Sequence, residues 1–194
     1  MTSAPPLPLL PARVHEACGA AAMTFAAIAC ACTPGLLLWI REAWLPEMLN
    51  PSGLSGILDP ARLMLARTRD QTDTLAVAEE ALRDGAIAFV VADITRPLGL
   101  REGRRLQLAA QAGRTTGLCL IPEGMGSNAA ETRWSCQPAF DPKGGADSTL
   151  MRWELIKNKK GISGVWHVRW DAQAHRLDVV SPVGSQPGAA PMPE

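Results

Sequence analysis

The residues most suggestive of chemistry lie at 14–25, where the sequence reads VHEACGAAAMTF. A phosphate-binding loop has the form G-x-x-x-x-G-K-[ST]: its backbone N–H groups surround the phosphates, its lysine contacts the β- and γ-phosphates, and its hydroxyl holds Mg²⁺. Gly19 and Thr24 fit parts of this pattern, but no lysine lies between them. The segment therefore predicts a degenerate nucleotide site, in which the fold of an ATPase is retained and ATP hydrolysis is lost.

Two acids follow apolar runs, as they do in phosphate-loop ATPases. Asp93 ends the run 86–92, where such an ATPase places the acid that holds Mg²⁺ or its water. Glu42 follows the run 36–40, where an acid can polarise the attacking water. Each also has a simpler interpretation, a loop cap for Asp93 and surface charge for Glu42. Because the lysine is missing, we favour the simpler interpretation of Asp93.

A basic turn follows an alternating strand pattern late in the chain and contains Lys157, Lys159 and Lys160. The commonest role of such a run is a solvated hairpin tip. The functional alternative is a set of cations offered to a phosphate or to an acidic partner surface. Both interpretations stay open at this point.

His15 and Glu16, beside the degenerate loop, are further candidates for catalysis. No nucleophile or partnered carboxylate can be placed next to them from the sequence. We therefore predict no catalytic residue and no metal site, and we expect neither ATP nor Mg²⁺ as a cofactor. The five cysteines fit no metal or disulfide spacing. Their usage predicts a reducing compartment, the cytoplasm.

The elements that must position these residues alternate between strand and helix. Continuous apolar runs predict buried strands, and i, i+3, i+7 periodicity predicts helices. Strands are expected at 36–40, 62–67, 86–93 and 116–121, and helices at 20–32, at 101–112 and from a cap at Asp70 or Thr72 to a stop at Gly85. This order predicts a parallel sheet with right-handed crossovers.

After residue 122 the helical periodicity gives way to alternation. Met151, Trp153 and Leu155 are expected on one strand face, and Trp166, Val168 and Trp170 on another. This pattern predicts antiparallel strands added to the parallel sheet. The predicted fold class is α/β, with a mainly parallel sheet and antiparallel C-terminal strands.

At 194 residues the chain is expected to form one domain at 13–183, between a Pro-rich arm at 1–12 and a flexible tail at 184–194. Nineteen basic and nineteen acidic residues balance, so net charge points to no nucleic-acid partner. The uncharged stretch 17–40 is interrupted at Pro34. It favours a buried helix followed by a strand, and no membrane association, because a span needs about 20 apolar residues in a row.

Together with this layout, four segments resemble the ImuA family, the inducible-mutagenesis protein A group. This RecA-like group is often placed alongside the cell-division inhibitor SulA. The segments are DPARL at 59–63, AEEALR at 78–83, TRW at 132–134 and WELIKNKKG at 153–161. The resemblance extends over about residues 13–180, and its specificity lies in the order and spacing of the segments.

The resemblance implies a RecA-like three-layer domain that serves as a non-catalytic accessory in DNA-damage-induced (SOS) translesion mutagenesis and DNA repair. It implies protein–protein contacts with a Y-family polymerase-like partner (ImuB), indirectly with an error-prone C-family polymerase alpha subunit, and with RecA itself. In RecA-type recombinases a K-N-K run contacts the ATP of the neighbouring subunit, and Lys157 and Lys159 match that run. The segment 122–130 is short where RecA has its long DNA-binding loop, which argues against RecA-style DNA contact.

Two alternative functions stay open. The chain could be an ATPase that binds nucleotide through an atypical loop. It could also be an inhibitor that caps RecA filaments by presenting a RecA-like edge.

Overall fold

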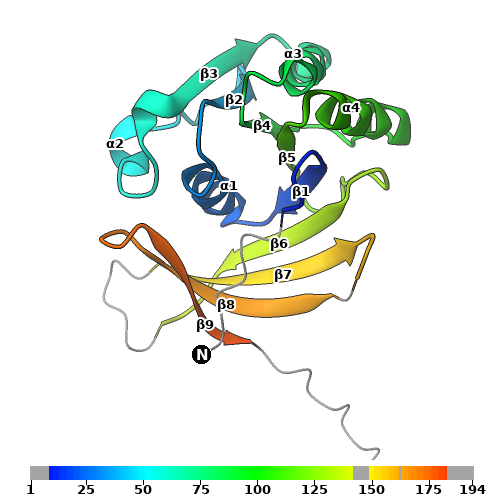
Figure 1. Ribbon diagram of the computed structural model, residues 1–194. Coiled ribbons are helices and arrows are strands. Elements are labelled where there is room, and N and C mark those ends of the chain that lie inside the picture. The colour runs from blue at the N-terminus through cyan, green and yellow to red at the C-terminus, as the bar shows by residue number, and fades with distance from the viewer. Residues whose placement is uncertain (1–8, 142–148, 162, 183–194) are drawn as a thin grey trace, which may run out of the picture.

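A nine-stranded sheet runs through the computed structural model, which describes residues 9–141, 149–161 and 163–182 (Figure 1). The predicted arm is thus described only from residue 9, and the predicted tail at 184–194 lies outside the described residues. The strands are β1 (Val14–Cys18), β2 (Leu37–Glu42), β3 (Leu63–Thr68), β4 (Phe89–Asp93), β5 (Thr116–Leu120), β6 (Thr132–Pro138), β7 (Leu150–Asn158), β8 (Gly164–Asp171) and β9 (Arg176–Pro182).

The strand order is β3-β2-β4-β5-β1-β6-β7-β8-β9. Every pairing from β3 to β6 is parallel, and the pairings from β6 to β9 are antiparallel. This arrangement confirms the predicted fold class. The helices are α1 (Ala22–Ala31), α2 (Pro51–Leu54), α3 (Gln71–Asp84) and α4 (Leu100–Gly113), with a 3-10 turn at Pro60–Arg62.

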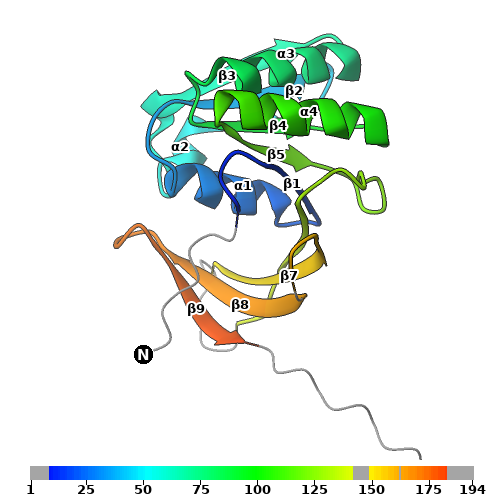
Figure 2. The ribbon, with the colours of Figure 1, turned by 45° about the vertical axis from the view of Figure 1, so that its right-hand side comes forward.

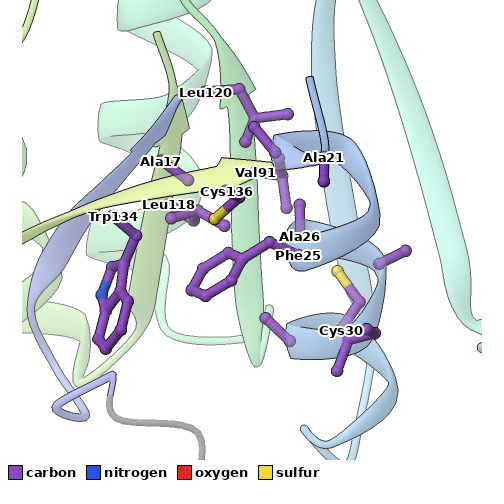
Figure 3. Close-up of a cluster of buried hydrophobic side chains, with 14 of the residues drawn as sticks. Ala17, Ala21, Phe25, Ala26, Cys30, Val91, Leu118, Leu120, Trp134 and Cys136 are labelled. Atoms are coloured by element: carbon purple, nitrogen blue, oxygen red, sulfur yellow. The ribbon is translucent and has the colours of Figure 1, made fainter. Parts of the chain in front are cut away.

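The helices form layers on both faces of the sheet (Figures 1 and 2). α3 and α4 cover one face of the parallel strands. α1 lies on the other face, where the sheet curls so that β6–β9 pass beneath this helix (Figure 1). Most of the α1 side chains are small, with seven of its ten residues buried, so the helix fits closely inside the curl. Phe25 is its largest buried side chain and packs against Trp134 and Trp153, with ring centroids 5.7 and 4.7 Å apart (Figure 3).

Local signals set the bounds of α3 as predicted. The Asp70 side chain accepts a hydrogen bond from the Asp73 backbone N–H at 3.0 Å, which is N-cap geometry. Gly85 ends the helix with φ at 81°, a left-handed conformation that glycine adopts without strain.

One expectation needs correction. No strand was predicted at Val14–Cys18, because the polar pair His15 and Glu16 breaks the apolar pattern, yet β1 lies inside the sheet between β5 and β6. The faces expected for the late strands are confirmed. The register pairs Trp153 with Trp166, so the predicted faces of β7 and β8 line the same core beneath α1.

Candidate functional site

The turn between β1 and α1 occupies the position of the phosphate loop. β1 ends at Cys18 and α1 begins at Ala22, so only Gly19, Ala20 and Ala21 connect them. The Ala21 N–H donates to the Cys136 carbonyl at 3.0 Å, and the Ala22 N–H donates to the Gly19 carbonyl at 3.0 Å. Backbone N–H groups that would hold phosphates in an open loop are thus bonded to protein acceptors.

β6 lies directly against this turn. Gly19 has φ at 95°, and a Cβ at this position would lie 2.4 Å from the Cys136 carbonyl oxygen. The Ala20 N–H is 3.4 Å from the Gln137 side-chain oxygen, which also comes from β6. Figure 3 shows Ala21 and Cys136 in the same buried cluster as Phe25. The turn is therefore closed against the neighbouring strand.

The other residues predicted for the nucleotide site, Thr24 and Asp93, come from a helix and from a different strand. Thr24 is on α1 and is partly exposed. Asp93 ends β4, and the register aligns Ala17, Leu120 and Asp93 across β1, β5 and β4. Because these strands are parallel, Asp93 and the turn lie at the same edge of the sheet. The topology thus gathers the predicted residues as it would in an ATPase.

Asp93 is buried and both of its oxygens have protein partners. The Trp39 indole N–H donates to Oδ1 at 2.9 Å, and the Arg41 Nε–H donates to Oδ2 at 2.5 Å. Burial raises the pKa of Asp93, and the bonds from Trp39 and Arg41 act in the opposite direction. Arg41 also donates to the Glu47 carbonyl at 2.7 Å. The carboxylate therefore joins β2 to β4 and does not serve as a loop cap.

Glu42, for which surface charge was the simpler of two interpretations, is buried, with 4% of its surface exposed. Its carboxylate accepts a hydrogen bond from the Trp44 indole N–H at 2.6 Å and another from the Thr95 hydroxyl. These bonds tie the segment after β4 to the end of β2. Glu42 thus has a structural role at the same edge of the sheet.

Two of the three lysines of the basic turn bind the loop between β5 and β6. Lys157 Nζ donates to the carbonyls of Ser127 at 3.3 Å, Asn128 at 2.9 Å and Ala130 at 2.6 Å. Lys159 Nζ donates to the carbonyl of Ala129 at 2.6 Å, so each carbonyl of residues 127–130 accepts from one of these lysines. We call residues 127–130 with these two lysines the lysine clamp.

Two further features define the environment of the lysine clamp. Partial burial lowers the pKa of Lys157, and the nearby charges of Arg133 and Lys159 lower it further. Lys160 is exposed, and its backbone N–H donates to the Asn158 side chain at 3.1 Å. The assignment of the three lysines to a phosphate or partner contact stays a prediction.

Glu16 contacts the lysine clamp at Ser127, a role that the sequence did not indicate. Its carboxylate is fully buried and accepts hydrogen bonds from the Ser127 N–H at 2.8 Å and from Arg133 Nε at 2.7 Å. Arg133 Nη2 also donates to the Ser127 carbonyl at 2.9 Å. Arg133 is 117 positions from Glu16, so no local pattern could have revealed the pair.

His15 holds the segment before β1 by a hydrogen bond to Leu10. The Trp134 indole N–H donates to the Thr132 hydroxyl at 3.0 Å, and that hydroxyl is 2.7 Å from His15 Nδ1. His15 Nε2 lies 3.0 Å from the Leu10 carbonyl. A carbonyl only accepts, so Nε2 is protonated, and in the neutral ring Nδ1 accepts from the Thr132 hydroxyl. Burial lowers the pKa of His15, in keeping with a neutral ring.

The described residues offer little for a metal centre, a reactive thiol or a membrane span. Within 9–141, 149–161 and 163–182, no group of three or more His, Cys, Asp or Glu residues could hold a metal ion. All five cysteines are free and only Cys32 is exposed, and burial raises the pKa of the Cys30 thiol to about 12. No helix in the described part of the chain has the length and apolarity needed to cross a membrane.

Comparisons with known proteins agree with this architecture. No family model matches the chain. Protein ImuA from two strains of Caulobacter vibrioides is 31% identical to the chain over 159 residues, which is 73% of this chain and 63% of that protein. The chain thus spans less than two thirds of the length of these curated relatives.

A solved structure, that of the RadB recombinase, superposes with a TM-score of 0.64 at 14% identity, covering 89% of this chain and 93% of that one. At this identity the likeness shows the fold alone. The resemblance stated from the sequence is confirmed: the chain is a homologue of ImuA with a RecA-like fold.

Proposed function

We propose that this chain is a non-catalytic, RecA-like accessory protein in DNA-damage-induced translesion mutagenesis. In this role it binds a Y-family polymerase-like partner of the ImuB type through protein contacts. The homology to ImuA supports the accessory role, and the RecA-like fold supplies the scaffold. The activity of the whole protein is part of the proposal, because the match spans only 63% of the length of ImuA.

The observation that carries the proposal is the closed turn at Gly19–Ala21. A phosphate needs several free backbone N–H groups and a nearby cation. Here the N–H groups of Ala21 and Ala22 are bonded within the protein, and the charge of Asp93 is balanced by Arg41. A scaffold of this kind presents the same surface whether or not nucleotide is present.

The two alternatives are less well supported. Nucleotide binding through an atypical loop would require the β6 backbone to move away from Gly19, because this backbone leaves no room even for a Cβ at position 19. Capping of a RecA filament by the basic turn would require Lys157 to give up the carbonyls of Ser127, Asn128 and Ala130, which take all three of its donors.

The test is a binding titration of the purified chain with the ImuB-type protein from the same genome, with and without Mg-ATP. We expect saturable binding with the same affinity in both conditions. Absence of binding would remove the proposed partner. Binding that appears only with Mg-ATP, and is lost in the Asp93→Asn variant, would overturn the non-catalytic scaffold in favour of the ATPase alternative.

A further inference from the structure

α4 exposes a line of side chains beside the lysine clamp. Leu100, Arg104 and Leu108 are spaced at i, i+4 and i+8, so they share one side of the helix. Leu100 is 46% exposed and Leu108 is 66% exposed. The opposite side of α4 already packs on the sheet through Leu106, Ala109 and Ala110. The two exposed leucines therefore contribute little to the core.

A hollow of about 400 Å³ runs along this line of residues. One wall is α4, and the other is formed by Asn128, Ala129 and Lys159 of the lysine clamp. Its volume is within the range of about 300–1,000 Å³ that is usual for binding clefts in proteins. The hollow is thus large enough for the side chains of a docked segment.

The walls of the hollow are fixed before anything binds. The Gln107 side chain joins them by donating to the Ala129 carbonyl at 3.2 Å. Gly103 lets α4 approach the loop closely, because a Cβ there would lie 2.6 Å from the Ser127 hydroxyl oxygen. Lys157 and Lys159 also hold the loop by donating to the carbonyls of Ala130 and Ala129. A preformed cleft loses little entropy when a ligand binds.

The lining combines apolar and positively charged groups. Arg104 and Lys159 are exposed there, and the lining contains no acidic residue. A lysine ammonium has three donors, and Lys159 has a hydrogen bond to the Ala129 carbonyl. The complementary ligand therefore presents large apolar side chains to the leucines and a carboxylate to the cations.

We propose that this hollow is a docking site for a peptide segment of a partner protein, with an acidic residue between two large apolar side chains. The two apolar groups would lie about 12 Å apart, the rise over the eight positions between Leu100 and Leu108. This inference rests on the proposed function, because it assigns the partner contact of the scaffold to this surface.

The composition of the hollow favours a protein ligand over nucleic acid. Single-stranded nucleic acid is bound by cations combined with aromatic side chains that stack on the bases. The lining contains two exposed leucines and no aromatic residue. Exposed apolar groups in a cleft with a polar rim are instead typical of protein interfaces.

The first experiment uses a defined probe and does not depend on the partner. A synthetic amphipathic helix with two leucines eight positions apart and glutamates between them is titrated into the ¹⁵N-labelled chain. We expect saturable amide shifts at 100–111 and 128–129, and at least about tenfold weaker binding in the Arg104→Glu variant. Shifts elsewhere, or none, would overturn the inference. Tighter binding of an oligothymidylate at the same amides would overturn it in favour of nucleic acid.

The second experiment uses the ImuB-type protein. We expect the Leu100→Ala/Leu108→Ala variant to bind it at least about tenfold more weakly than wild type. The matched control is Met64→Ala/Leu65→Ala on β3, where both side chains are 41% exposed, and it should bind like wild type. If wild type binds and both variants bind equally, the docking site is wrong while the proposed function stands. If wild type does not bind, the proposed function fails, and the peptide titration alone decides the docking site.

Discussion

The turn after β1 and the hollow beside α4 differ in how their polar groups are used. At the turn, the N–H groups of Ala21 and Ala22 are bonded within the protein, and β6 fills the space above Gly19. In the hollow, Leu100, Leu108 and Arg104 are exposed on α4, and Lys159 is exposed although it is bonded to the Ala129 carbonyl. The difference indicates that a RecA-like fold can bond the polar groups around Gly19–Ala21 and Asp93 within the protein and still present a surface suited to a ligand elsewhere.

The largest expected effect on the free energy of unfolding comes from breaking the ion pair between Arg41 and Asp93. Arg41→Ala would leave the Asp93 carboxylate buried without its cation, which typically costs about 3–5 kcal/mol. Urea unfolding measures this loss. The control is the double variant Arg41→Met/Asp93→Leu, which removes both charges and should recover most of the stability. If Arg41→Ala were as stable as wild type, Asp93 would not be a structural residue.

The next effect tests the closed turn itself. Gly19→Ala places a Cβ against the Cys136 carbonyl in a left-handed backbone conformation, so we expect a loss of about 2–4 kcal/mol. Gly124→Ala is the matched control, because Gly124 also has positive φ, at 78°, but has open space around its Cβ position. It should lose only about 1–2 kcal/mol. Equal losses in thermal unfolding would mean that β6 does not press on the turn.

A smaller effect is expected from the lysine clamp. Lys157→Met removes three donors to the loop and should cost about 1–2 kcal/mol, with faster amide hydrogen exchange at 127–130. Lys160→Met, in an exposed lysine of the same turn, should change neither quantity. Unchanged exchange in Lys157→Met would show that the walls of the hollow are not held by the lysines.

The smallest effect is a pH dependence from His15. Its pKa is lowered in the folded protein, so the unfolded chain binds the proton more readily. The contribution of the neutral ring is complete above the unfolded pKa of about 6.5, and it is lost as the pH falls below that value. We expect His15→Gln to unfold with a weaker dependence between pH 7.5 and 5.5 than wild type. Parallel pH profiles for the two proteins would contradict this assignment.

The sequence predicted those parts of the fold that depend on local patterns. Asp70 and Gly85 bound α3 because caps act over a few residues, and the apolar runs identified β2, β4 and β5. β1 was missed because its polar residues are compensated from far away. His15 is paired with Thr132 and Glu16 with Arg133, each 117 positions along the chain.

The candidate site was predictable in position but not in geometry. The segment that lacks the lysine and the acid at Asp93 lie at the same edge of the sheet, as their likeness to parts of a phosphate-loop ATPase implied. The sequence could not reveal that Arg41 neutralises Asp93, or that Lys157 and Lys159 turn toward their own loop. Such contacts depend on which strands become neighbours, and strand order is a property of the whole fold.

The most direct test of the closed turn follows the Ala21 and Ala22 amides by NMR while Mg-ATP is added to millimolar concentration. The structure predicts that both resonances stay in place and exchange slowly with solvent, because their N–H groups are bonded to Cys136 and Gly19. Saturable shifts of these two amides, with faster exchange before nucleotide is added, would show that the turn opens to hold phosphate and would contradict the account.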